Sequence, residues 1–166
     1  MMLRQMAVAW IRRDGCYAMI KKKRSKLADF EFWAALGGHM EPHEIGNPRE
    51  ACLREIYEES GLRESDLHEL ALRYVLIRRK DREIRIQYVF FGSTDKAALT
   101  ESDEGELHWV DEDKIGELKT SAIVKEMYMH YRNHADAEHA FVGTITGTAD
   151  GKPMMQWAVL TDPGVF

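Results

Sequence analysis

Three glutamates, Glu55, Glu58 and Glu59, lie close together in a segment that the sequence predicts to be a helix. Each residue advances about 100° around a helix, so Glu58 lies roughly 60° to one side of Glu55 and Glu59 roughly 40° to the other. All three carboxylates therefore share one face. Like charges at this spacing repel one another, and a cation between them would reverse the sign of that interaction. Magnesium suits such a group, because it prefers oxygen ligands and is often shared between carboxylates and substrate phosphates.

The helix that presents these acids is predicted over Pro48–Ser60. Asn47 is a typical N-cap, Pro48 suits the first helical position, and Glu50 completes a pattern like a capping box. Gly61 is placed to end the helix in a left-handed conformation. We expect the side opposite the carboxylates to pack against the core, through Leu53, Ile56 and Tyr57.

An acidic stretch on a helix is more often a solvated surface than a metal site. Arg54 could also pair with Glu50 and Glu58, one turn away on either side. The surrounding sequence favours the metal site. It reads GHMEPHEIGNPREACLREIYEESGL from Gly38 to Leu62.

This stretch resembles the Nudix signature, which is a Gly, five residues, a Glu, seven residues, and then Arg-Glu-apolar-x-Glu-Glu-x-Gly-apolar. Gly38 and Glu44 have the family's spacing. The second half matches at every specified position, through Arg54, Glu55, Ile56, Glu58, Glu59, Gly61 and Leu62.

The chain departs from the family pattern at two places. Two extra residues separate Glu44 from Arg54, and we expect them in the loop at Ile45-Gly46, where a longer connection costs little. They put in doubt where Glu44 lies relative to the metal ions. Leu36 stands where the family commonly has a proline, which loosens a turn but removes no ligand.

The resemblance implies a metal-dependent hydrolase that cleaves a phosphoanhydride bond in a nucleotide-like substrate, using Mg²⁺, for which Mn²⁺ is a substitute. By position, Glu58 and Glu59 are expected to bind metal, and Glu55 either to bind metal or to activate water. The Gly38 carbonyl is a further expected ligand. Arg54 is expected to orient the glutamates, with Glu44 as a support behind them.

Other candidate site residues rest on weaker patterns. Glu104 and Glu106 belong to an acidic stretch that could supply one more acid, although solvated surface is the commoner role of such residues. Arg24 is the preferred phosphate contact among the basic residues that end the second strand. Trp33 is a candidate for stacking on a base, with core packing as the alternative.

The substrate is approached by elimination. The markers of the ADP-ribose, dinucleoside polyphosphate and coenzyme A subfamilies are missing at their usual distances from the signature. A nucleoside di- or triphosphate, with oxidised nucleotides among the candidates, becomes the leading hypothesis, and an ADP-ribose or nucleotide-sugar pyrophosphatase remains an alternative. A second alternative is a nucleotide-binding sensor without catalysis, against which the intact acids argue.

Composition sets limits on partners and location. The 166 residues suit one domain, spanning 1–166, with the Nudix signature at 38–62 and a C-terminal hairpin extension at about 134–166. A net charge of −5 argues against binding duplex nucleic acid. No apolar run reaches the length of a membrane span, and the apolar stretch near the N-terminus is too short for a signal peptide, so the cytoplasm is the expected location.

Strand-like and helix-like segments mix along the chain. Strands are expected over 6–11, 16–22, 30–36, 70–77, 84–91 and 106–110, and a second helix over 121–131. Segments 140–146 and 153–160 flank Asp150-Gly151 and predict a hairpin. Its apolar residues could pair in a homodimer or cover the core. The expected fold is the α/β (α+β) Nudix fold, a mixed β-sheet sandwiched between helices in an α/β/α arrangement.

Overall fold

A computed structural model describes residues 1–23, 31–100 and 102–164 of the protein. The helices are α1 (Pro48–Ser60) and α2 (Ala122–Asn133), with three short 3-10 turns at Pro42–Glu44, Glu64–Asp66 and Ile115–Glu117. The strands are β1 (Met2–Arg13), β2 (Cys16–Lys23), β3 (Glu31–His39), β4 (His68–Lys80), β5 (Glu83–Ser93), β6 (Glu106–Asp111), β7 (Ala140–Gly147) and β8 (Pro153–Leu160).

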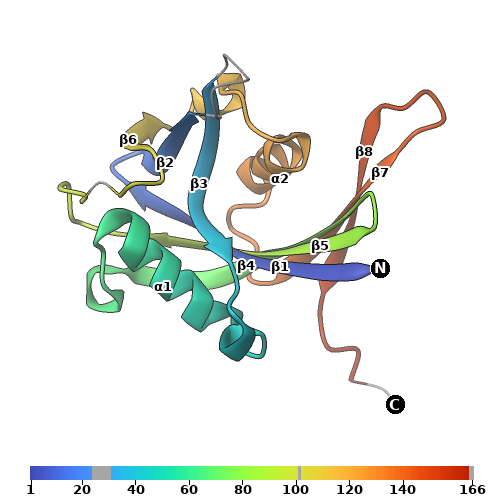
Figure 1. Ribbon diagram of the computed structural model, residues 1–166, viewed down its shortest axis with the longest axis horizontal. Helices are drawn as coiled ribbons and strands as arrows, with labels where there is room; N and C mark the ends of the chain where they lie inside the picture. Colours follow the sequence, from blue (N-terminus) through green and yellow to red (C-terminus); the bar gives the residue numbers. More distant parts are fainter. Residues whose placement is uncertain (24–30, 101, 165–166) are drawn as a thin grey trace.

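All of these strands belong to one mixed sheet, in the order β6-β2-β3-β1-β5-β4-β7-β8. Strand β1 runs parallel to β5, and β4 runs parallel to β7, while the other pairs are antiparallel. Helix α1 lies on one side of the sheet and α2 on the other (Figure 1). The predicted α/β/α arrangement is therefore confirmed.

Alternation along β1 separates the core into two parts. Ala7, Ala9 and Ile11 are buried on the side of α1, whereas Trp10 is buried on the side of α2. Successive side chains of a strand point to opposite faces, so one apolar strand serves both layers. Trp10 stacks on Tyr128 of α2 with ring centroids 5.0 Å apart.

Helix α1 begins and ends at the predicted residues, but its packing face differs from the prediction. Asn47 accepts a hydrogen bond from the Glu50 backbone N–H at 3.3 Å, and Gly61 has a φ of +74°. The buried apolar residues are Ala51, Cys52 and Ile56, while Tyr57 is exposed. The expectation for Tyr57 was wrong, because the face of α1 that packs against the sheet lies next to the glutamates and not opposite them.

Strands β7 and β8 extend the sheet beyond β4. The ring of Trp157 on β8 covers Gly143 on β7 and stacks on His130 of α2 at 4.2 Å. This hairpin therefore covers part of the core on the α2 side. Met154, Val159 and Leu160 remain about half exposed on β8, which pairs only with β7 among the described strands. No helix in the described ranges is long and apolar enough to cross a membrane.

Candidate active site

Two of the three clustered glutamates, Glu55 and Glu58, line a cavity of about 620 Å³ between the end of β3, the loop that follows it and helix α1. Its walls come from five parts of the sequence: β1, β2, the end of β3 with the loop after it, α1 and the loop before β6. The lining residues are Met6, Lys22, Gly37, Gly38, His39, Met40, Glu41, Pro42, Arg54, Glu55, Glu58 and Glu104.

The three glutamates differ in burial, because Glu59 belongs to the packed face of α1 and Glu58 lies farthest from it. The side chains of Glu59, Glu55 and Glu58 are 3 %, 12 % and 55 % exposed. Burial raises the pKa of Glu59 to about 7, and it also raises the pKa of Glu55, with Arg54 opposing the shift. The site thus holds two carboxyl groups whose charged forms are only partly compensated by their neighbours.

Two glycines let the end of β3 approach these acids. The Gly37 N–H donates a hydrogen bond to Glu59 Oε2 at 2.6 Å. A Cβ at Gly38 would lie 2.6 Å from Glu55 Oε1, so a larger residue there would collide with that carboxylate. The close approach explains in physical terms why Gly38 stands at the start of the signature.

Arg54 links the acids on the helix to the preceding loop. Its Nη1 donates to Glu55 Oε1 and to Glu58 Oε2, each at 2.9 Å. On its other side it forms a two-pronged pair with Glu44, with Nε to Oε1 at 2.7 Å and Nη2 to Oε2 at 3.0 Å. Nη2 also donates to the His39 carbonyl at 3.1 Å. Arg54 is therefore in position to orient the glutamates.

Glu44 reaches Arg54 despite the two extra residues in the signature. Ile45 and Gly46 form a turn outside the 3-10 segment, and Ile45 is exposed. The Glu44 carboxylate is buried and also accepts a hydrogen bond from the Glu41 backbone N–H at 2.8 Å. These contacts, with Arg54 first, lower the pKa of Glu44 to about 2. The insertion is absorbed locally, and Glu44 lies behind Arg54.

Of the two additional acids, Glu104 lies at the cavity and Glu106 does not line it. Glu104 Oε2 is 3.0 Å from Lys22 Nζ, and its charge raises the pKa values of Glu55 and Glu59. Glu106 points to the α2 side, where it lies 3.4 Å from His108. Alternation along β6 accounts for the difference, because Leu107 and Trp109 face α1 instead.

The two predicted substrate contacts have different outcomes. Arg24 lies outside the described residues. Trp33 packs against the core on the α2 side, 5.4 Å from the ring of His108, and is not among the residues that line the cavity.

Lys22, at the end of β2, is a second basic residue beside the acids, in addition to Arg54. Its Nζ is 3.9 Å from Glu59 Oε1 as well as close to Glu104. The sequence held a signal for it, because Ala18 and Ile20 face α1 and alternation puts Lys22 on the same side. Met6, Met40 and His39 also line the cavity, and no motif pointed to them.

The donor chemistry of the cavity fits a divalent cation, but the acids are not gathered around a common point. Among the described residues, no three acidic, histidine or cysteine side chains are placed to hold a metal as they stand. Arg54 occupies one oxygen each of Glu55 and Glu58. Glu59 Oε1 is buried without a hydrogen-bond partner, which is costly unless a cation or water meets it.

Comparison with known proteins agrees with this geometry. The family model of the NUDIX domain matches residues 2–131. No curated protein matches the chain.

Solved structures resemble the chain in fold at low sequence identity. A MutT protein from Bacillus halodurans is 20 % identical with a TM-score of 0.72, covering 96 % of this chain and 99 % of its own. A MutT protein from Methanosarcina mazei Go1 is 20 % identical with a TM-score of 0.67, covering 81 % and 96 %. An Ap4A hydrolase from C. elegans is 13 % identical with a TM-score of 0.64, covering 82 % and 98 %.

The fold and the signature define an enzyme of the Nudix class, a pyrophosphohydrolase. The chain belongs to the Nudix family.

Proposed function

We propose that the protein hydrolyses a phosphoanhydride bond in a nucleoside di- or triphosphate, or in a nucleoside diphosphate derivative, with Mg²⁺ or Mn²⁺ bound by Glu55, Glu58, Glu59 and the Gly38 carbonyl. One observation carries the proposal. Glu55 and Glu58 of α1 line a cavity, and Glu59 Oε1, beside the cavity residue Gly37, is buried without a hydrogen-bond partner. A divalent cation would satisfy that oxygen and hold the ionised forms of these acids.

The chain's own residues divide the remaining tasks. The bound cation would neutralise charge on the phosphoryl oxygens and lower the pKa of water. Glu55 is largely shielded from solvent, and burial raises its pKa, which suits a base that takes a proton from the attacking water. Arg54, anchored by Glu44, fixes the Glu55 carboxylate in place. Lys22 is in position to meet an outer phosphate oxygen of the substrate.

Glu104 is proposed as the additional acid of the site. It shares the cavity with Glu55 and Glu58, whereas Glu106 does not line it. Its present partner is Lys22, so a substrate phosphate that attracted Lys22 would release the Glu104 carboxylate toward the cation.

The proposal covers two groups of substrate, nucleoside phosphates and nucleoside diphosphate derivatives. The structures that resemble the chain include MutT proteins and an Ap4A hydrolase, and these names support a nucleotide substrate without choosing one. Oxidised nucleotides therefore remain candidates beside ADP-ribose and nucleotide sugars. Arg24 and Trp33 stay proposals as substrate contacts.

A nucleotide sensor without catalysis is the rival from another functional class. It would keep the fold and the cavity but would not need all the acids. A screen that measures phosphate release from nucleotides, oxidised nucleotides and nucleotide sugars separates the two functions. We expect release from at least one compound with Mg²⁺ and none with a chelator. Binding of nucleotides without any release in the whole screen would favour the sensor.

We further propose that the chain acts as one domain and pairs with a second copy through β8. Its half-exposed Met154, Val159 and Leu160 form an apolar strand at the edge of the sheet. Natural proteins usually cover such an edge. Both cysteines are free thiols, as a reducing compartment allows, so the cytoplasm stays the proposed location.

A further inference from the structure

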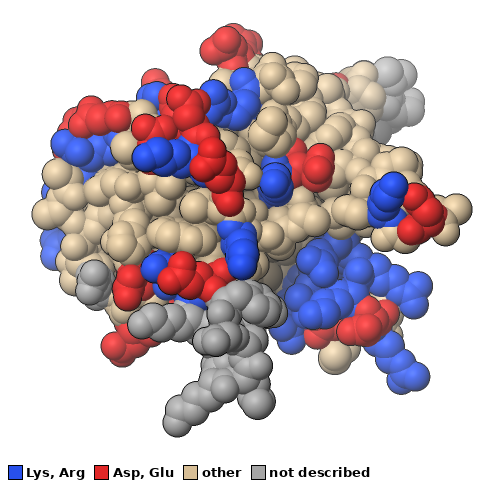
Figure 2. Space-filling model, turned by 90° about the horizontal axis from the view of Figure 1, so that it is seen from above, with Lys and Arg blue, Asp and Glu red and all other residues tan. Residues whose placement is uncertain are grey.

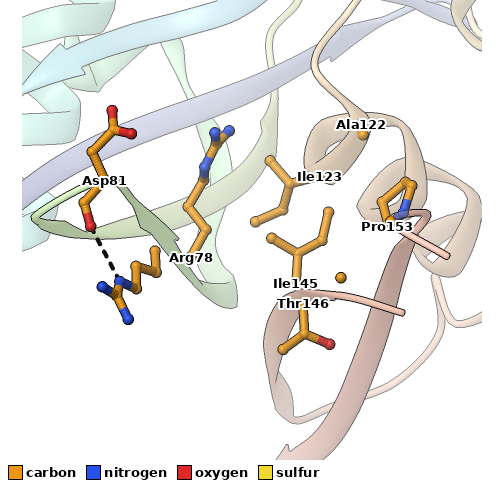
Figure 3. A pocket seen from close by; sticks show the side chains of 10 residues that line it. Arg78, Asp81, Ala122, Ile123, Ile145, Thr146 and Pro153 are labelled. Carbon is orange, nitrogen blue, oxygen red and sulfur yellow. Dashed lines mark hydrogen bonds between the residues drawn. The ribbon is translucent and has the colours of Figure 1, made fainter. Parts of the chain in front are cut away.

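Two cavities lie on the α2 side of the sheet. The larger, of about 720 Å³, opens between Arg78, Ile123 and Ile145 (Figure 3). It borders the turn between β4 and β5, where Lys and Arg side chains crowd together at the lower right of Figure 2. Its charged wall is therefore part of a general basic surface. The smaller cavity, of about 290 Å³, has a more selective lining of two arginines, a glutamate and three aromatic rings.

The smaller cavity is separate from the carboxylate cavity. It is lined by Arg12, at the end of β1, and by Tyr17, Phe91 and Tyr131, which belong to or pack against the core on the α2 side. The two cavities meet β1 at Arg12 and at Met6, which are roughly 20 Å apart along a strand that rises about 3.3 Å per residue. The acids of α1 lie on the other face of the sheet.

Two irregularities at the start of β4 place charged residues at this cavity. The register of β4 against β5 shifts around Glu69 and again around Arg73, and both residues line the cavity. Glu69 has a φ of +53°, a left-handed conformation that residues other than glycine seldom adopt. Leu72 packs on the α1 side and Tyr74 on the α2 side, so the second bulge changes the face that the strand presents. Bulges and strained residues of this kind are common at functional sites.

Arg73 and Glu69 carry opposite charges but do not neutralise each other. Within the described ranges, neither side chain forms an ion pair. Nη2 of Arg73 donates to the carbonyls of His134 and Ala135, each at 3.1 Å, and the guanidinium lies 5.5 Å from the centre of the Tyr131 ring. Its Nε is buried without a hydrogen-bond partner. A buried donor in this state is costly unless a ligand or water meets it.

The other polar groups of the lining add no further free charge. Glu112 neutralises Arg12, with Nε to Oε2 at 3.0 Å and Nη2 to Oε1 at 3.3 Å. Burial raises the pKa of Tyr17 well above its ordinary value, so its hydroxyl stays neutral. Among the lining residues that the structure describes, Arg73 and Glu69 are therefore the cation and the anion without a charged partner.

We propose that this cavity binds a free amino acid with an apolar side chain of about the size of leucine, its carboxylate on Arg73 and its ammonium group on Glu69. A guanidinium binds a carboxylate through paired hydrogen bonds, and a carboxylate accepts from an ammonium group. Since a water molecule takes up about 30 Å³, the cavity has room for roughly ten non-hydrogen atoms. The rings of Tyr17 and Phe91 offer apolar surface to the side chain. The site makes no use of the carboxylate cavity, so its failure would leave the proposed function intact.

Calorimetric titration of the whole chain with L-leucine tests the site, with two analogues that each lack one charge. Isocaproate lacks the ammonium group and isoamylamine lacks the carboxylate. Wild-type protein should bind L-leucine, and each analogue should bind at least about fivefold more weakly, because one charge of the cavity then stays unpaired. Isocaproate that binds as tightly as L-leucine, or no binding of L-leucine at all, would overturn the proposal.

Variants assign the two charges to their residues. Glu69→Gln should weaken L-leucine binding at least about fivefold and leave isocaproate binding unchanged, because isocaproate has no ammonium group to lose its partner. Arg73→Lys should weaken both compounds, since an ammonium group cannot form the paired hydrogen bonds. Glu126→Gln is the matched control, because Glu126 is exposed on α2 and does not line the cavity, and it should bind L-leucine like the wild type. A Glu69→Gln protein with wild-type affinity for L-leucine would contradict the site.

Discussion

At the scale of single residues, graded burial separates the roles of acids that look alike in sequence. Glu59 is shielded and has a pKa raised to about 7, Glu58 is exposed, and Glu44 has a pKa lowered to about 2 by Arg54. The types and spacing of these residues were visible in the signature. Their burial was not, because it depends on how α1 is rotated against the sheet.

The acid that joins the helix glutamates is predicted to be Glu104. Glu104→Gln should lower turnover roughly tenfold, since it removes a carboxylate that adjoins the cation ligands. Glu106→Gln is the matched control, because Glu106 does not line the cavity, and it should retain full turnover. Steady-state kinetics of the two variants decide the matter, and the reverse ranking would remove Glu104 from the site.

The Glu44–Arg54 pair should make stability depend on acid pH. The pKa of Glu44 is about 2 in the folded protein against an ordinary 4.5, so its contribution is present above pH 4.5 and lost as the pH falls toward 2. Full loss corresponds to roughly 3 kcal/mol in the free energy of unfolding. Urea unfolding at a series of pH values should show Glu44→Gln well below the wild type at pH 7 and close to it near pH 2. A constant gap between the two proteins would contradict this origin.

At the scale of helices and strands, the residues at helix ends and in turns predicted the elements that they bound. The bounds of α1 follow from Asn47, Pro48 and Gly61, and the β1–β2 and β4–β5 hairpins follow from their turns. The parallel pairs β1–β5 and β4–β7 could not be predicted, because they join segments that are far apart in the chain and whose apolar patterns suit several partners. For the same reason the sequence left Trp33 open between base stacking and core packing, and the structure packs it against the core.

The end of α1 depends on a glycine. Gly61 has a φ of +74°, and a Cβ there would lie 2.8 Å from Thr100 Oγ1. Gly61→Ala should therefore cost about 1–2 kcal/mol, which lowers the melting temperature by roughly 2–8 °C in a domain of this size. Gly46→Ala is the control, since open space surrounds that residue and its φ is not positive. Equal melting temperatures for the two variants would show that the cap is not under strain.

At the scale of the whole molecule, the fold brings together charges that are far apart in the sequence. The acids of α1 share a cavity with Lys22 and Glu104, and Arg4 of β1 lies in register with Arg85 of β5. The sequence displayed these charges, but only the fold shows which of them are neighbours. It also leaves β8 as an edge with half-exposed apolar residues, which the sequence could not distinguish from a strand that covers the core.

If β8 pairs with a second copy, the protein should sediment as a dimer at micromolar concentration. Val159→Lys would then shift it to a monomer, because charge on an edge strand opposes pairing between chains. Glu138→Lys is the control, because Glu138 is exposed just before β7, and this variant should leave the dimer intact. A wild-type protein that sediments as a monomer would end the dimer proposal without affecting the others.

The central claim is that the acids of α1 hold a divalent cation for hydrolysis, and Glu58→Gln tests it most directly. Glu58 is exposed, so the variant should fold normally, which its melting temperature would verify. With Mg²⁺ and the best substrate from the screen, we predict that turnover falls roughly 100-fold or more, since an expected ligand is lost. Undiminished turnover in a folded Glu58→Gln protein, or wild-type turnover that persists with a chelator, would contradict the claim.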